Sequence, residues 1–317
     1  MKLIIQIPCY NEEQTLPLTF ADLPKQIDGI DEIEVLIIDD GSSDKTVEIA
    51  QQLGIDHIVI NKKNMGLAAS FRRGIDECLR QGADIIVNTD GDNQYAGWDI
   101  PKLVKPVLNN EADIVIGDRE THKISHFSKG KKFMQWLGSG IVRKLAGIWV
   151  PDTVSGFRAI SRESAIKLNV LSTFSYTIEM VIQAGNRNLT IISVPVETND
   201  KTRESRLFKS IPSFIIRQVS TIVRMYAMYQ PLKVFFIIGS ILSITGIIPI
   251  IRFMYFYYTS GGAGHIQSLV LGGILLMMGF ITFLGGLIAD LISFNRKLSE
   301  MALEQIRTNE FSRNKNK

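Results

Sequence analysis

The 317-residue chain is poor in the residues that bind metals through sulfur or imidazole, with two cysteines and four histidines. With only Cys9 and Cys78, a disulfide scaffold and a four-cysteine zinc site are excluded. Neither sign of charge dominates, because 35 Lys and Arg balance 32 Asp and Glu to a net charge of +3. This balance argues against a strongly basic nucleic-acid coat and an acidic disordered tail, so nucleic acid is not an expected partner.

Charged residues are almost absent from one stretch near the C-terminus. Between Val234 and Ala289, Arg252 is the only Asp, Glu, Lys or Arg. Residues 232–258 and 268–291 are each long enough to cross a bilayer core, which needs about 20 apolar residues. We therefore predict a hairpin of two transmembrane helices over residues 232–291. Two buried helices of a soluble protein are the alternative, although such helices rarely lack a polar face over this length.

Lys and Arg flank the predicted hairpin at both ends and are absent from the linker between its helices. Arg224 and Lys233 lie near the start of the first span, and Arg296 and Lys297 follow the second. Positive residues concentrate on the cytoplasmic side of membrane proteins. We expect a multi-pass protein of the cell (inner) membrane with its N-terminal domain and both termini in the cytoplasm, and residues 292–317 as a basic cytoplasmic tail.

Residues 207–231 combine apolar side chains at helical spacing with intervening Lys209 and Arg217. This pattern is typical of amphipathic helices that lie on a membrane surface, so membrane lipids are expected partners. A helix packed on the N-terminal domain is the alternative.

Apolar runs alternate with helix-like segments in the N-terminal part. Strands are predicted at residues 3–7, 34–38, 57–60, 84–88, 113–116 and 190–194, and helices at 11–23, 44–53, 66–81 and 100–109. Such alternation favours an α/β domain with a doubly wound, mostly parallel sheet.

Acidic residues gather at the ends of three predicted strands. Glu12 follows the first, Asp39 ends the second, and Asp90 and Asp92 follow the fourth. Ligands bind beyond the carboxyl ends of the strands in sheets of this kind, where clustered carboxylates are costly without a cation. Asp-x-Asp followed by Gln94 supplies the hard oxygen ligands that Mg²⁺ and Mn²⁺ prefer. A diphosphate is the obvious partner of such an ion, whereas the absence of Gly-rich ATPase and dinucleotide motifs argues against those activities.

Five motifs carry a resemblance to a known family. They are Pro8-Cys9-Tyr10-Asn11-Glu12, Asp39-Asp40-Gly41-Ser42, Asn64-Met65-Gly66, Asp90-Gly91-Asp92-Asn93-Gln94 and Asp152-Thr153-Val154-Ser155-Gly156-Phe157-Arg158. In this order they resemble family 2 glycosyltransferases of the GT-A fold, and above all the dolichol- and polyprenyl-phosphate sugar synthases. The resemblance implies a cytoplasmic GT-A catalytic domain over residues 1–206, and the hairpin is similar to that of bacterial polyprenyl-phosphate glycosyltransferases.

The resemblance also implies a role for each motif. The donor nucleotide would be bound by Pro8, Tyr10, Glu12, Asp39, Gly66 and Asp90, and the metal, Mg²⁺ or Mn²⁺, by Asp90, Asp92 and Gln94. The acceptor phosphate would meet Arg119, Arg158 and Ser155. The catalytic residues would be Asp152, Asp92, Arg203 and Arg206.

The reaction that the resemblance implies is metal-dependent, inverting transfer of a hexose from a nucleotide diphosphate sugar to polyprenyl phosphate. A phosphate monoester, with a second pKa of about 6, is a nucleophile at neutral pH, so no strong general base is required. Asp152 would then position the acceptor or assist weakly. We favour UDP-glucose or a related UDP-sugar as donor. A GDP-mannose-dependent polyprenyl-phosphate mannosyltransferase, or transfer to another lipid or glycan acceptor, is the alternative.

Three departures from the family pattern bear on these roles. Asp90-Gly91-Asp92-Asn93 stands where the family has Asp-Ala-Asp-Leu, and Thr202-Arg203-Glu204-Ser205-Arg206 where it has Arg-x-x-Gly-x-Ser-Lys. Gly138-Ser139-Gly140 lacks the arginine that dolichol-type enzymes use for the acceptor phosphate.

Other classes of protein fit the sequence less well. The chain has no Gln-x-x-Arg-Trp motif of processive synthases. A non-catalytic nucleotide-sugar sensor or scaffold would not need the aspartates, and two spans offer little wall for a transporter. Glycines in both spans would allow a homo-oligomer through the hairpin.

Overall fold

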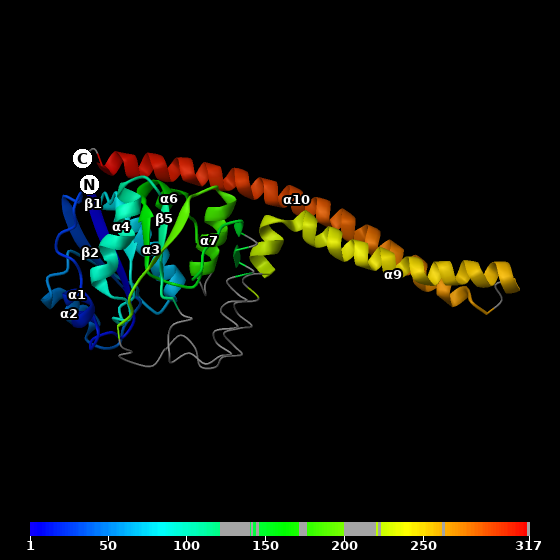
Figure 1. Cartoon of the computed structure of the whole chain (residues 1–317), viewed down its shortest axis with the longest axis horizontal. Coiled ribbons are helices and arrows are strands. Elements are labelled where there is room, and N and C mark those ends of the chain that lie inside the picture. Colours follow the sequence, from blue (N-terminus) through cyan, green and yellow to red (C-terminus); the bar gives the residue numbers. More distant parts are fainter. Residues whose placement is uncertain are drawn as a thin grey trace. The chain divides into compact units, whose positions relative to one another are not determined.

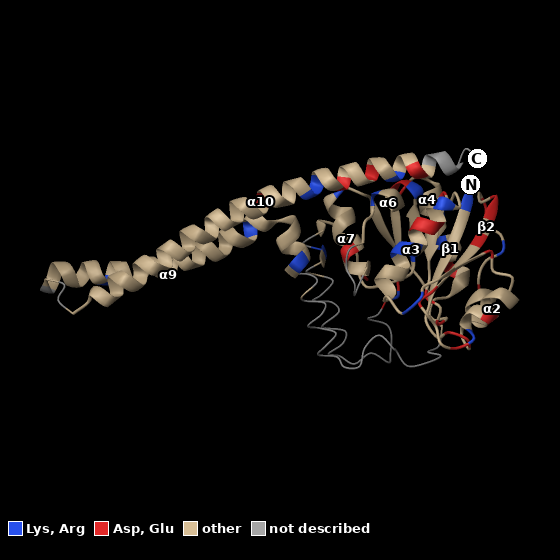
Figure 2. Cartoon of the chain, turned by 180° about the vertical axis from the view of Figure 1, so that it is seen from behind, with Lys and Arg blue, Asp and Glu red and all other residues tan. Residues whose placement is uncertain are grey.

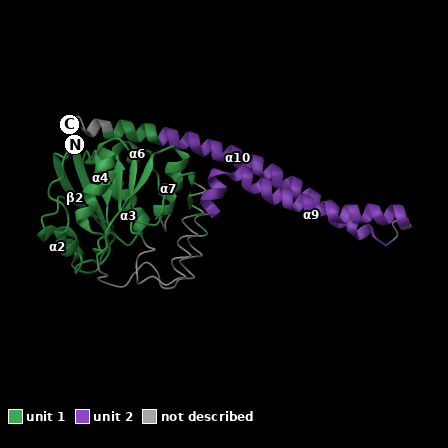
Figure 3. Cartoon of the chain, viewed as in Figure 1, with its two compact units in different colours: residues 1–222, 304–317 green, residues 223–303 purple. Residues whose placement is uncertain are grey.

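A computed structural model of the chain describes residues 1–120, 140, 142–143, 146–170, 176–199, 220, 223–261 and 264–315. It consists of two units, residues 1–222 with 304–317, and residues 223–303 (Figure 3). Figure 1 labels the helices and strands.

Unit 1 contains a seven-stranded sheet in the order β3-β2-β1-β4-β6-β5-β7. Its strands are β1 (Lys2–Cys9), β2 (Glu32–Asp39), β3 (His57–Ile60), β4 (Ile85–Asn88), β5 (Ile114–Asp118), β6 (Arg158–Ser161) and β7 (Ile191–Pro195). Pairing is parallel except where β6 lies antiparallel between β4 and β5. The mostly parallel sheet and six of its strands confirm the prediction, whereas β6 was not predicted.

Helices cover both faces of the sheet. They are α1 (Leu16–Ala21), α2 (Thr46–Gln52), α3 (Leu67–Arg80), α4 (Ile100–Leu108), α6 (Arg162–Lys167) and α7 (Tyr176–Asn186), with the short 3-10 helix η1 (Gly97–Asp99) before α4. Because successive side chains of a strand point to opposite faces, Leu3 and Ile5 of β1 join a core that includes Leu103 of α4. Gln6 points the other way, toward Cys78 of α3. Central strands buried on both faces explain the nearly continuous apolar run of β1.

Unit 2 contains two long apolar helices, α9 (Pro231–Ser260) and the first part of α10 (Ile266–Lys315). Both are long and apolar enough to cross a membrane, with mean hydropathies of 2.5 and 2.2, and Figure 2 shows few charged residues over this part. These helices match the predicted spans, and α10 continues beyond residue 291 as one helix.

Glycines let the two helices of the hairpin approach each other closely. A methyl group on Gly246 would lie 3.0 Å from the carbonyl oxygen of Gly272, and one on Gly279 would lie 3.0 Å from that of Gly239. Small residues allow such close backbone contact between helices in membranes. These four glycines therefore serve packing inside the hairpin, and the predicted homo-oligomer stays a prediction.

The C-terminal end of α10 belongs to unit 1 and contacts α3 and α6 there. The guanidinium of Arg307 donates to the carbonyls of Ile166 (3.0 Å) and Leu168 (2.7 Å) and pairs with Asp76 at 2.5 Å. Phe311 is buried, and its carbonyl accepts a hydrogen bond from Arg162. The end of the segment read as a basic tail is thus a structural part of the domain.

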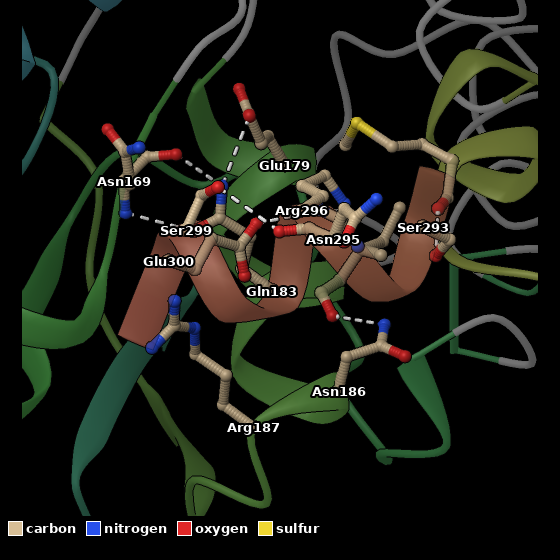
Figure 4. A network of polar contacts seen from close by, with 12 residues as sticks. Asn169, Glu179, Gln183, Asn186, Arg187, Ser293, Asn295, Arg296, Ser299 and Glu300 are labelled. Atoms are coloured by element: carbon tan, nitrogen blue, oxygen red, sulfur yellow. Dashed lines mark hydrogen bonds and ion pairs between the residues drawn. The ribbon is translucent and has the colours of Figure 1, made fainter. Parts of the chain in front are cut away.

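The connection after α6 is also held by α7. The Gln183 side chain accepts from the backbone N–H of Asn169 (3.0 Å) and donates to its carbonyl and to Glu179 (3.1 Å), as Figure 4 shows. Together with Arg307, Gln183 therefore fixes the backbone of residues 168–169 by side-chain hydrogen bonds.

We predict that Arg307→Met lowers the melting temperature of unit 1 in the detergent-solubilised full chain by roughly 4–8 °C. Losing the ion pair and two hydrogen bonds of a mostly buried arginine should cost about 2 kcal/mol. Lys105→Met, at an exposed position of α4, is the control. Equal melting temperatures for the two variants would show that the C-terminal segment does not stabilise the domain.

Candidate active site

The carboxyl ends of β1, β2 and β4 lie side by side at one edge of the sheet. Cys9 pairs with Asp39, and Gln6 pairs with Asn88. A methyl group on Gly91 would lie 3.0 Å from the Cys9 sulfur, so the turn after β4 packs on the end of β1. Burial and the nearby charges of Glu12 and Asp39 raise the pKa of the Cys9 thiol. The structure therefore gathers these acidic groups as predicted.

Asp39 has one carboxylate oxygen bound by the chain and one without a partner. Its Oδ2 accepts from the N–H groups of Gly41 and Ser42, both at 3.1 Å. Its Oδ1 is buried and has no hydrogen-bond partner among the described residues. Orphaned buried acceptors are rare in native proteins, so an N–H group of a ligand fits here. Tyr10, which is 39% exposed, directly follows the neighbouring strand β1.

The turn before α3 is fixed by Asp40. Its carboxylate accepts from the N–H groups of Met65 and Gly66, both at 2.9 Å, and from the Asn61 amide at 2.8 Å. Gly66 has φ +90°, a conformation that glycine adopts without steric cost. The chain of residues 64–66 is thereby held next to the end of β2.

The two proposed metal ligands after Asp90 contact each other. Asp92 accepts from the backbone N–H of Gln94 at 3.2 Å and from its side-chain amide at 3.0 Å. Among the described residues no group of three or more His, Cys, Asp or Glu is arranged to hold a metal. Asp90, Asp92 and Gln94 instead combine two carboxylates with an amide, an all-oxygen donor set that fits Mg²⁺ or Mn²⁺.

Arg119 and Asp152 form a bidentate ion pair on the other side of the site. Arg119 Nε lies 2.7 Å from Asp152 Oδ2, and Nη2 lies 3.1 Å from Oδ1. The Arg119 guanidinium also lies 6.0 Å from the centre of the Tyr95 ring. Arg119 follows β5 and Asp152 precedes β6, so the antiparallel pairing of these strands brings the two residues together. Both were predicted as site residues.

Arg158 and Ser155 lie inside the protein. The Arg158 side chain is fully buried and donates to the carbonyls of Thr153, Ser155 and Thr177, at 2.8–2.9 Å. Burial lowers the pKa of Arg158 to about 10. Ser155 is buried as well, and its hydroxyl has no partner among the described residues. As placed, Arg158 shapes the 152–156 loop, and its predicted contact with the acceptor phosphate stays a prediction.

The remaining predicted residues divide between the site and a region not described. Pro8 precedes Cys9, the last residue of β1, and Tyr10 and Glu12 follow the strand. Arg203 and Arg206 lie outside the described residues, so their roles also stay predictions.

Three residues of the site were missed. The Asn88 side chain donates to the Gly156 carbonyl (2.9 Å) and to the Tyr176 hydroxyl (3.0 Å). The Tyr95 hydroxyl accepts from the Gly156 N–H at 2.9 Å. Asn88 could have been noticed, because it is a polar residue directly after the apolar run of β4, in line with Gln6 on β1, to which it is hydrogen-bonded.

Comparison with protein families identifies the family to which the chain belongs. Residues 4–168 match the model of Glycosyl transferase family 2, which covers every described motif of the site. The chain belongs to glycosyl transferase family 2.

Two proteins similar in sequence have names that include a lipid phosphate. Undecaprenyl-phosphate mannosyltransferase of Micrococcus luteus is 28% identical over 206 residues, which cover 62% of this chain and 83% of that protein. The UDP-N-acetylglucosamine–dolichyl-phosphate N-acetylglucosaminyltransferase of Methanococcus voltae is 30% identical over 61% of this chain and 83% of that protein.

A solved structure of similar fold is glucosyl-3-phosphoglycerate synthase from Mycobacterium tuberculosis, crystallised with Mn²⁺, UDP and glucosyl-3-phosphoglycerate. The TM-score is 0.54 at 19% identity, and the match covers 71% of this chain and 78% of that chain. At this identity the match shows the fold alone. The predicted family and GT-A fold are confirmed. Membership of this family makes the protein a glycosyltransferase.

We predict that Arg158→Lys lowers the free energy of unfolding by about 3 kcal/mol, because lysine cannot reproduce the fork that binds three buried carbonyls. Denaturant unfolding of the purified chain measures the change. Arg80→Lys, at an exposed position of α3, is the control. Unchanged stability together with a raised KM for lipid phosphate would instead show that Arg158 contacts the acceptor.

Proposed function

We propose that this family 2 glycosyltransferase transfers a hexose, with inversion, from a nucleotide diphosphate sugar to polyprenyl phosphate at the cytoplasmic face of the cell membrane. The observation that carries the proposal is the close approach of an acidic and a basic half-site. Asp90 lies against Gly156, whose N–H donates to the Tyr95 hydroxyl. The Arg119 guanidinium, paired with Asp152, lies 6.0 Å from the centre of the Tyr95 ring. One half suits a metal-bound diphosphate, and the other suits a second phosphate.

The acidic half would bind the donor. Asp39 offers a buried acceptor for an N–H group of the base, and Tyr10 offers an aromatic surface beside it, with Pro8, Glu12 and Gly66 around them. Asp90, Asp92 and Gln94 would hold Mg²⁺ or Mn²⁺, which neutralises charge on the leaving diphosphate when bound. Arg203 and Arg206 would add positive charge to that same group.

The basic half would bind the acceptor. Two N–H groups of Arg119 bind Asp152, and the other donors of the planar guanidinium suit a phosphate. The acceptor phosphate needs no strong base, and a carboxylate held in an ion pair is a weak one. Asp152 therefore acts by orienting Arg119, and Ser155 and Arg158 shape the adjoining loop.

The apolar helices support a lipid acceptor. Two helices able to cross a membrane occur in the same chain as the catalytic unit, and polyprenyl phosphate is a membrane lipid whereas nucleotide sugars are water-soluble. The flanking Lys and Arg support a topology with both termini in the cytoplasm.

UDP-glucose or a related UDP-sugar is the favoured donor. GDP-mannose is the second candidate, because a relative of this chain is named a mannosyltransferase, and the buried acceptor of Asp39 suits either base.

The test is a turnover assay of the full chain in detergent micelles. It combines undecaprenyl phosphate, Mg²⁺ or Mn²⁺ and a panel of UDP- and GDP-sugars, with Asp92→Asn as the variant. We expect glycolipid product from wild type with one donor, and at least a hundredfold less from Asp92→Asn or after EDTA, as for loss of a catalytic metal ligand.

The outcomes separate the alternatives. Nucleotide release without lipid product would indicate another acceptor. If neither turnover nor nucleotide binding occurs with any donor, the proposal is wrong and a non-catalytic scaffold becomes the better reading.

A further inference from the structure

Gly156 lies where the two halves of the site meet, and its peptide groups are held at both ends. Its N–H donates to the Tyr95 hydroxyl at 2.9 Å. Its carbonyl accepts from the Asn88 amide at 2.9 Å, and the Tyr176 hydroxyl lies 3.5 Å away as a second, longer donor.

Gly156 also lies against the carboxylate of Asp90. A methyl group at this position would lie 3.2 and 3.3 Å from the two carboxylate oxygens, and 2.9 Å from the Tyr176 hydroxyl oxygen. No side chain larger than hydrogen fits without displacing one of these groups. The position of Gly156 therefore limits where the Asp90 carboxylate can lie.

The two tyrosines are themselves fixed by ring stacking. Tyr176 stacks on Phe71 of α3 with centroids 3.9 Å apart, and Tyr95 stacks on Phe157 at 5.0 Å. Burial raises the pKa of both hydroxyls, so they stay neutral at physiological pH. The stacking therefore holds each ring, and with it the hydroxyl that contacts the Gly156 peptide, in one position.

We propose that Tyr95 and Tyr176 are positioning residues for the donor site: their hydroxyls fix Gly156, and Gly156 in turn fixes the carboxylate of Asp90. The inference rests on the proposed function, because that function assigns Asp90 to the metal and nucleotide. It assigns the tyrosines no contact with substrate. It also makes α7, which carries Tyr176, a support of the donor half of the site.

Tyr95→Phe and Tyr176→Phe test the proposal, because each variant keeps the stacked ring and removes one hydroxyl. The full chain in micelles is titrated with UDP and GDP in the presence of Mn²⁺, and KM is measured separately for donor and for lipid phosphate. For Tyr95→Phe, which leaves a buried N–H unpaired, we expect roughly tenfold weaker nucleotide binding and higher donor KM. For Tyr176→Phe, which removes a longer bond, we expect about threefold. The acceptor KM should not change in either variant.

Gly156→Ala tests the last step, from Gly156 to Asp90. We expect it to weaken Mn²⁺–nucleotide binding more than either tyrosine variant. The double variant Gly156→Ala/Tyr176→Phe removes the closest clash, with the hydroxyl, but keeps the contact with Asp90. Nucleotide binding should therefore stay weak in the double variant. Recovery to the affinity of Tyr176→Phe would show that the alanine acts through the hydroxyl and would overturn the link to Asp90.

The control is Tyr257→Phe, the same chemical change on an exposed side chain of α9. Wild-type binding by both tyrosine variants, with wild type itself active, would overturn the inference and leave the proposed function intact. Equal losses for donor and acceptor, in step with a lowered melting temperature, would show a merely structural role and would also overturn it. Absence of nucleotide binding by wild type would overturn the proposed function itself.

Discussion

The parallel pairing of β1 with β2 on one side and β4 on the other is the constraint on which the site depends. Parallel strands end at the same edge of a sheet, so residues that follow them in sequence become neighbours in space. Here the register places the end of β1 beside Asp39 and aligns Gln6 with Asn88. Carboxylates up to 80 residues apart are thereby concentrated in one small region. Their mutual repulsion is unfavourable in the free protein, and under the proposed function a cation with its diphosphate would relieve it.

The single reversed strand adds the second half of the site. Because β6 runs antiparallel to β4, its first residue, Arg158, pairs with the last residue of β4, Asn88. The 152–157 segment before β6 therefore lies at the same edge as the residues after β4. The antiparallel partner β5 ends there too, which brings Arg119 to Asp152. An all-parallel strand in this position would have placed the segment before it at the opposite edge. The approach of acidic and basic groups thus follows from one change of strand direction.

Much of the donor half could be predicted from sequence, because strand ends are visible as apolar runs followed by polar residues. Asp39, Asp90 and Asp92 were found in this way. The other half was harder, since β6 has four residues and begins with an arginine, which no hydrophobic pattern marks as a strand. Tyr95 and Tyr176 were missed for a related reason. Their importance lies in hydroxyls that reach one peptide from different elements, and such long-range geometry leaves no periodicity in the sequence. Arg307 likewise carries no local sign that it binds the end of α6.

Arg119 and Arg158 show why residue type alone does not assign a role. Both lie near Asp152, and both are expected from the family resemblance to meet the acceptor phosphate. A guanidinium needs partners for its N–H groups when it leaves water, and the partners decide what it can do. Arg158 is surrounded by three backbone carbonyls, so its N–H groups are directed at the backbone. Arg119 has a carboxylate on one edge and an aromatic ring nearby, an arrangement that orients the group through two of its five N–H donors. Under the proposed function, Arg119 held in this way is preorganised for a doubly charged phosphate, whereas Arg158, which already binds three carbonyls, would have to give up those bonds to reach it.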